Sequence, residues 1–241
     1  MHSKDALDYL LFLLSVPKCV CCRDKLSFKE KALCPKCSAE FEEIKNRNCS
    51  KCAKVLSKCS CAPHYLSTHF VKGVIKCFRY NVREENLPAN HLIYSLKRDN
   101  RDDVLEKCTD ELSRAIGNSL SVDDSFIITN IPRRKKAVIE YGIDHSELLA
   151  KSVAKRFGVK YLPLLKSKTK REQKKLNFDE RVKNIDLELT SEQDLKGKTV
   201  IIVDDIITTG ASISCAAALI RSLGTRSIYA ATLAIAYKDD L

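Results

Sequence analysis

Two adjacent carboxylates followed by a run of hydroxyl groups form the most distinctive chemical pattern in the sequence. Asp204 and Asp205 come directly after a continuous apolar run at 199–203, and a Thr-Thr-Gly-Ala-Ser turn follows at 208–212. Two carboxylates can accept hydrogen bonds from the 2- and 3-hydroxyls of a ribose. Hydroxyl groups and the free N–H groups of a helix N-terminus suit a phosphate monoester, which Gly210 lets the backbone approach closely. The pattern therefore predicts a site for a phosphorylated sugar.

Cysteine is the most unusual part of the composition, because nine of the twelve cysteines lie between Cys19 and Cys61. Closely paired cysteines can form a disulfide scaffold, a redox motif or a zinc site. Zinc prefers four tetrahedral ligands, and a Cys-x-x-Cys knuckle supplies two of them. Cys21 is then left over, and His64 or His69 could replace a ligand of the second, less regular site. We expect two structural zinc sites: Cys19, Cys22, Cys34 and Cys37 in one, and Cys49, Cys52, Cys59 and Cys61 in the other.

One apolar run, at 9–16, is the candidate for a targeting or membrane segment. It is far shorter than the ~20 residues of a membrane span, and it follows Asp5 and Asp8 rather than a basic cluster. We therefore interpret residues 1–17 as a buried apolar helix closed by Pro17, with no membrane span. We expect a cytoplasmic protein, in which thiols stay reduced and zinc is favoured over disulfides.

The overall composition narrows the class of protein. The 241 residues are 44% apolar, which is enough for a packed core and excludes global disorder. The formal net charge of +11 suggests polyanionic partners such as nucleic acid or phosphorylated metabolites. Neither of the common glycine-rich phosphate loops, G-x-x-x-x-G-K-[ST] or G-x-G-x-x-G, is present.

Strand and helix patterns alternate from about residue 65 onward. Strands are predicted at 70–78, 126–131, 161–165, 199–203 and 227–236, and helices at 87–97, 102–116, 146–157 and 211–223. This alternation indicates an α/β fold with a doubly wound, mostly parallel sheet and helices on both faces. We expect three parts: the apolar helix at 1–17, a double zinc ribbon at 18–63 without a core of its own, and the α/β domain at 65–241.

The alternation breaks at 166–187, where six basic residues and one acidic residue lie within ten positions. Two interpretations are open. The segment is either a solvated, mobile hairpin or a flexible basic lid over a phosphate-rich ligand.

Residues 200–212 closely resemble the 5-phosphoribosyl-1-pyrophosphate (PRPP) loop of type I phosphoribosyltransferases. More of the chain is similar to the ComF family of competence proteins, which carry a zinc ribbon before such a domain. The matching stretches are 131–134 with 141–150 ("VP…RGFNQ…LLA"), 166–184 ("R…Q…L…R..N"), Tyr80 with Leu96-Lys97 ("Y…LK"), and the four cysteine pairs. The chain departs from the family pattern at Tyr141 and at Asp144-His145, where the family has Arg and Asn-Gln.

The resemblance implies roles for individual residues. Asp204 and Asp205, the catalytic pair, would hold the ribose hydroxyls, and Arg133 and Arg134 would bind pyrophosphate. Mg²⁺ would accompany PRPP, and a nitrogen nucleophile would displace pyrophosphate from C1 of the ribose. The remaining PRPP-binding positions are Ile207, Thr208, Thr209, Gly210, Ala211 and Ser212, and those of the lid are Lys168, Lys170, Gln173 and Arg181. His91 and His145 are expected to be surface or packing residues.

Three functions remain open. The chain is a phosphoribosyltransferase with an unknown acceptor, a ComF-like factor that handles incoming single-stranded DNA with a DNA-uptake helicase as partner, or a PRPP-sensing regulator without turnover. Only 7% of the residues are aromatic and none is Trp, which argues against strong base stacking. Any DNA binding should therefore be mainly electrostatic.

Overall fold

The structure is a computed structural model that describes residues 16–49, 51–59, 61–63, 66, 71–81, 83–84, 87–120, 126–133, 138–139, 142–167, 187–191 and 193–236. The apolar helix expected at 1–17 lies outside these residues except at its last two positions. Within the described part of the chain, no helix combines the length and the apolar character needed to cross a bilayer.

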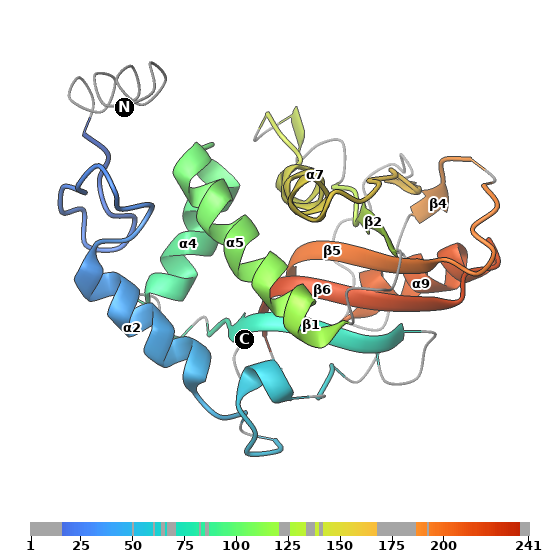
Figure 1. Cartoon of the computed structure of the whole chain (residues 1–241), viewed down its shortest axis with the longest axis horizontal. Coiled ribbons are helices and arrows are strands. Elements are labelled where there is room, and N and C mark those ends of the chain that lie inside the picture. The colour runs from blue at the N-terminus through green and yellow to red at the C-terminus, as the bar shows by residue number, and fades with distance from the viewer. Residues whose placement is uncertain are drawn as a thin grey trace, which may run out of the picture.

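Four parallel strands form the central sheet, in the order β1–β6–β5–β2 (Figure 1). Strands β5 and β6 pair over their whole lengths, from Thr199 opposite Ser227 to Ile207 opposite Ile235. Their continuous apolar sequences suit strands that are buried on both faces. The strands are β1 (Val71–Arg79), β2 (Phe126–Asn130), β5 (Thr199–Ile207) and β6 (Ser227–Ile235).

Helices cover both faces of this sheet, which confirms the predicted doubly wound arrangement. Helices α5 and α7 pack on one face with α4 beside α5, while α9 packs on the other. Side chains of β5 alternate accordingly: Ile201 and Val203 join the core under α7, and Val200 and Ile202 join the core with α9. The helices are α4 (Pro88–Arg98), α5 (Asp102–Ser119), α7 (His145–Phe157) and α9 (Ala211–Arg221).

Two predicted strands differ in extent from the observed ones. Strand β5 continues past Val203 to Ile207, so both aspartates lie within the strand rather than after it. The strand predicted at 161–165 is wrong. Tyr161 forms only an isolated parallel bridge with Ile128, because the next N–H on that edge, that of Leu164, donates to the carbonyl of Leu162 and to the hydroxyl of Thr129 instead of to the backbone of β2.

The basic segment begins and ends in a small antiparallel ladder. Strand β3 (Leu165–Ser167) pairs with β4 (Leu187–Leu189), and Lys166 forms an ion pair with Glu188 across it. Residues 168–186, which include the four predicted lid residues Lys168, Lys170, Gln173 and Arg181, lie outside the described residues.

The cysteine-rich segment contains a helix that the sequence analysis did not predict, α2 (Pro35–Asn46), and a short 3₁₀ turn, η1 (Leu56–Lys58). Its buried residues Cys37, Phe41 and Ile44 follow helical spacing. In the sequence this periodicity is hidden, because Cys37 also belongs to a Cys-x-x-Cys pair and is expected to be a ligand. The ring of Phe41 packs edge-on against Phe78 of β1, with centroids 5.3 Å apart, so α2 shares the core of the α/β domain.

Strand order also locates the place where a ligand would bind. The chain leaves β2 through α7 and returns at Tyr161, which pairs with β2, whereas it leaves β5 through α9 and returns at β6 on the other side. The connections therefore diverge between β2 and β5. In open α/β sheets, ligands bind at the carboxyl ends of the strands at such a point.

Candidate functional site

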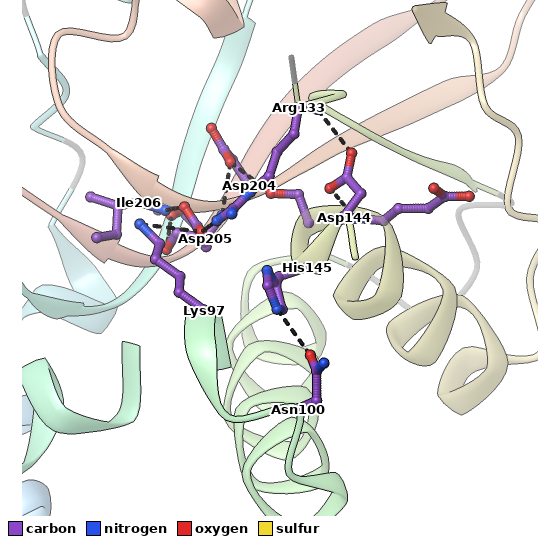
Figure 2. Close-up of polar contacts among 11 residues, drawn as sticks. Lys97, Asn100, Arg133, Asp144, His145, Asp204, Asp205 and Ile206 are labelled. Carbon is purple, nitrogen blue, oxygen red and sulfur yellow. Dashed lines mark hydrogen bonds and ion pairs between the residues drawn. The ribbon is translucent and has the colours of Figure 1, made fainter. Parts of the chain in front are cut away.

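The two aspartates lie at the carboxyl end of β5, at the point where the connections diverge. Asp205 is buried, with 6% of its surface exposed, and Asp204 is half-buried. Arg133 follows β2 at the same edge of the sheet, and residues 144–146 begin α7 above it. The fold thus brings together residues from β2, β5 and α7, as Figure 2 shows.

Asp205 carries two cations on a single carboxylate oxygen. Its Oδ2 lies 2.9 Å from a guanidinium nitrogen of Arg133 and 3.3 Å from Nζ of Lys97, which reaches across from the last turn of α4 (Figure 2). The Oδ1 atom accepts a hydrogen bond from the backbone N–H of Ile206. The predicted pyrophosphate ligand Arg133 is therefore present in the site, and in this structure it is bound to the predicted ribose ligand.

Asp204 is held differently from its neighbour. Its Oδ1 accepts hydrogen bonds from the hydroxyl of Ser146, at 3.0 Å, and from the backbone N–H of Asp205, and no cation forms an ion pair with it among the described residues. Burial and the nearby charge of Asp205 raise the pKa of Asp204 to about 7. Asp204 is therefore close to half-protonated at neutral pH.

Asp144 ties the start of α7 to the loop after β2. Its side chain caps α7 by accepting from the backbone N–H of Glu147 and also accepts from the backbone N–H of Arg133, at 2.8 Å. This acid stands at a position where the chain departs from the ComF pattern. The structure shows that it fixes the backbone of the arginine that contacts Asp205.

His145 is a buried residue beneath these charges, as expected of a packing histidine, and only 2% of its surface is exposed. Its Nε2 lies 3.2 Å from Oδ1 of Asn100. Its Nδ1 is buried and has no hydrogen-bond partner among the described residues. Burial and the positive charge of Arg133 lower the pKa of His145, so the neutral ring is favoured.

The hydroxyl turn lies directly after β5 and begins α9. Gly210 has a left-handed backbone (φ +82°), as the first residue before the helix, and a Cβ atom there would lie 2.6 Å from Cγ of Leu66. The hydroxyl of Thr209 accepts from the backbone N–H of Ala211, and Thr208 is exposed. This geometry leaves hydroxyl and N–H groups at a helix start, which suits a phosphate.

The remaining predicted ligand positions differ in burial, and some of them lie outside the described residues. Ser212 is half-buried at the start of α9. The side chain of Ile207 is buried in the core, so only its backbone can contribute to the site. Arg134 lies outside the described residues, as do the lid residues.

The cysteines form the two predicted groups of four. The Sγ atoms of Cys19, Cys22, Cys34 and Cys37 lie within 4.8 Å of one another, and so do those of Cys49, Cys52, Cys59 and Cys61. This spacing is compatible with a tetrahedron of thiolates around zinc, whose edges are about 3.8 Å for Zn–S bonds of about 2.3 Å. Each group can therefore hold a zinc ion with no position left for water.

In each group the backbone favours the thiolate at one cysteine, whereas burial and neighbouring thiols raise the pKa of others, such as Cys37 and Cys59. Burial opposes ionisation of Cys19, but backbone N–H groups of Cys34, Cys22 and Cys21 outweigh it and lower its pKa to about 7. Cys49 shows the same balance, and the backbone N–H groups of Lys51 and Cys52 help to lower its pKa to about 6. Thiolate is the form that binds metal.

The two groups are attached to the sheet by different contacts. The first contributes to the large core through α2, whereas among the described residues the second forms a separate apolar cluster with Leu56. The second group contacts the sheet through Lys76 of β1, a buried lysine whose Nζ donates to the carbonyl of Cys61. Backbone contact between β1 and η1 adds to this attachment.

Several residues of the site were not identified as such from the sequence. In the sequence, Lys97 stands out only as part of a family segment, Asp144 only as a departure from the family pattern, and Ser146 only as a helix start. His145 is expected to be a surface or packing residue and not part of the site. Their contacts depend on how α4 and α7 dock, which local patterns do not encode. One signal was available for Asp144: Asp followed three residues later by Glu147 is typical of a capped helix start.

Comparison with known proteins bears on the same region. Residues 144–240 match the family described as "Phosphoribosyl transferase domain". No curated protein matches the chain.

Solved structures similar to the chain include a purine phosphoribosyltransferase from Pyrococcus horikoshii (20% identity, TM-score 0.37, 55% of this chain and 81% of that chain covered). They also include an adenine phosphoribosyltransferase from Thermoanaerobacter pseudethanolicus (22% identity, TM-score 0.37, 56% and 80% covered). The chain therefore has a phosphoribosyltransferase-like fold, and residues 144–240 match the phosphoribosyl transferase domain family.

Proposed function

We propose that this chain binds PRPP or another 5-phosphoribosyl ligand together with Mg²⁺ at residues 204–212. The observation that carries the proposal is the position of Asp204, Asp205 and the hydroxyl turn at the point between β2 and β5 where the connections diverge. The matched domain includes all of these residues.

Each part of the ligand has a group of matching chemistry. The aspartates would accept hydrogen bonds from the ribose hydroxyls, and the turn at 208–212 would hold the 5-phosphate. Arg133 lies beside Asp205 and would face the pyrophosphate on C1, with Arg134 and the basic segment as further cations. The two cysteine groups would each hold a structural zinc ion.

The reaction that this arrangement supports is transfer of the phosphoribosyl group. A nitrogen nucleophile forms a bond to C1 of the ribose while the bond from C1 to the pyrophosphate oxygen breaks, and pyrophosphate leaves with the electron pair. Negative charge grows on the leaving group, so a cation such as Arg133 stabilises the transition state electrostatically.

Mg²⁺ bound with PRPP would neutralise part of the pyrophosphate charge. The described residues fit an ion that arrives with its ligand: both oxygens of Asp205 already have partners, which leaves mainly Asp204 to accept a hydrated Mg²⁺. Mg²⁺ sites of this kind combine one or two carboxylates with substrate phosphates and water.

Calorimetry with PRPP and Mg²⁺ on zinc-loaded protein tests the binding. We expect saturable binding that D204N/D205N weakens strongly while the fold remains. E42Q/E43Q, which removes two exposed acids from α2, is the matched control and should bind like the wild type. Absence of binding by the wild type at millimolar PRPP would overturn the proposal. Pyrophosphate release with candidate bases then separates an enzyme from a PRPP sensor.

The resemblance to ComF proteins favours a role in natural competence, in which the chain handles incoming single-stranded DNA beside a DNA-uptake helicase. The net charge of +11 and the basic segment support electrostatic binding without sequence preference. Binding measured against salt should then be linear on logarithmic axes, with a slope of about −0.7 for each phosphate neutralised.

The variant K168A/K170A/K174A/K175A should flatten that slope by up to about 3. K151A/K155A/K160A/K198A removes the same number of charges elsewhere and should flatten it less. Equal effects of the two variants, or binding that ignores salt, would contradict a DNA-binding role for the basic segment.

A further inference from the structure

Lys97 lies in the candidate site although it precedes both the matched domain and the PRPP-like segment. It is in the last turn of α4, and its Nζ shares Oδ2 of Asp205 with the guanidinium of Arg133 (Figure 2). About a third of the Lys97 side chain is exposed, compared with 9% of the Asp205 side chain. Lys97 therefore lies between the buried carboxylate and solvent.

The position of Lys97 relative to the ligand follows from the chemistry of PRPP. The 2-hydroxyl of the ribose is on the carbon next to C1, which bears the pyrophosphate. A cation within hydrogen-bond range of the carboxylate that accepts this hydroxyl is therefore close to the pyrophosphate. The 5-phosphate is on the opposite side of the ring, toward the turn at 208–212.

Asp205 cannot satisfy two cations and a ribose hydroxyl with the same oxygen. A carboxylate offers about four acceptor sites, of which three on Asp205 are occupied, so a diol that places both hydroxyls on Asp205 must displace Lys97 or Arg133. The contact from Lys97 to Asp205 is longer than that from Arg133, and the Lys97 side chain is the more exposed of the two. The flexible stem of Lys97 can also reorient. A displaced ammonium group keeps its charge and needs a new anion.

We propose that Lys97 exchanges partners when the ligand binds, from Asp205 in the free protein to the pyrophosphate of PRPP. This inference rests on the proposed function, and it adds a pyrophosphate-binding residue supplied by α4. Lys97 then has two opposing effects on affinity: it competes for Asp205 with any ribose ligand, and it attracts only a ligand with a phosphate on C1.

The test compares PRPP with ribose 5-phosphate, both with Mg²⁺, by calorimetry on zinc-loaded protein. K97M should weaken PRPP binding by roughly 10- to 150-fold, the range for a hydrogen bond to a charged group. The same variant should bind ribose 5-phosphate as well as the wild type does, or more tightly, because Asp205 is released. K97R keeps the charge and should retain most of the PRPP affinity.

R98M is the matched control. Arg98 is the next residue of the same helix turn, is exposed, and stacks on Tyr94 rather than entering the site. R98M should leave the ratio of the two affinities unchanged. If K97M and R98M give the same ratio, or K97M weakens both ligands equally, the role of Lys97 is overturned while the proposed function stands. If the wild type binds neither ligand, the proposed function fails and the inference fails with it.

Discussion

The cysteine groups and the aspartate site both bring several acidic side chains close together. They differ in which cation offsets the negative charge of these side chains. At the aspartate site the chain supplies its own cations, since Arg133 and Lys97 both contact Asp205. In each cysteine group the Sγ atoms of four thiols lie within 4.8 Å of one another. A bound metal ion would supply the positive charge that offsets the four thiolates. The comparison teaches that one region is organised before its ligand arrives, whereas we expect the other to depend on zinc to fold.

Removal of zinc should therefore produce the largest effect on the protein. Structural zinc contributes about 10–16 kcal/mol in zinc-finger peptides. A chelator should abolish protection from hydrogen exchange over 18–63, and the loss should extend to the part of β1 around Phe78, which packs on Phe41. Strands β5 and β6 should keep their protection.

A pair of adjacent cysteines provides the control for the ligand sets. Metal analysis should find two zinc ions per chain in the wild type and in C21S, and about one in C22S, because Cys21 is not in either group of four. Loss of zinc from C21S would show that the first ligand set is wrong. A metal-free chain that stays folded over 18–63 would remove the contrast between the two regions.

The turn after β5 should give the next largest effect, because its backbone is fixed without any ligand. G210A forces a left-handed backbone on a residue with a Cβ, at about 1–2 kcal/mol, and presses that Cβ against Leu66, at about 1–3 kcal/mol. G158A has the same strain (φ +66°) with nothing within 4 Å. Denaturant unfolding should show the larger loss for G210A, and equal losses would show that Leu66 does not restrict the turn.

Thr209 tests whether the turn also binds phosphate. T209A removes one hydroxyl donor, so PRPP affinity should fall by about 1.5–3 kcal/mol, or roughly 10- to 150-fold. S222A removes a hydroxyl at the other end of α9 and should leave the affinity unchanged. Unchanged binding by T209A would mean that the phosphate is held elsewhere.

The smallest expected effect concerns Asp204, the carboxyl group that has no cation as an ion-pair partner among the described residues. The pKa of Asp204 is raised to about 7, above its unfolded value near 3.9, so the folded state binds more protons between these values. The contribution of Asp204 to stability is therefore lost as pH rises from about 4 to about 7. D204N should be more stable than the wild type at pH 8, by on the order of 1 kcal/mol, or roughly 2–4 °C in melting temperature.

The same comparison between D204N and the wild type should give nearly equal melting temperatures at pH 4, where Asp204 is protonated. The pKa of His145 is lowered, so its contribution to stability has the opposite pH dependence. His145 is present in both proteins, and its contribution therefore cancels in the difference between their melting temperatures. A constant difference across this pH range would show that Asp204 titrates normally.

The sequence was most informative where function depends on residues close together in the chain. The spacing of the cysteines predicted both groups of four, and β5 with its following turn was recognisable from one uninterrupted run. It was least informative where contacts join distant segments. The ion pairs from Lys97 and Arg133 to Asp205 depend on tertiary docking. The strand that the apolar pattern at 161–165 favoured is ended by a local turn, in which the N–H of Leu164 donates to the carbonyl of Leu162.

Helix α2 has a consequence for which sequence changes the chain can accept. Its first turn carries Cys37, a predicted zinc ligand, and its next turns carry Phe41 and Ile44, which are buried in the shared core. A helix turns about 100° per residue. One residue inserted between Cys37 and Phe41 would rotate the aromatic ring away from Phe78, and three or four residues would be needed to bring it back to the same face. Chain-length variation is therefore restricted within this helix, because the cysteine group fixes its rotational phase.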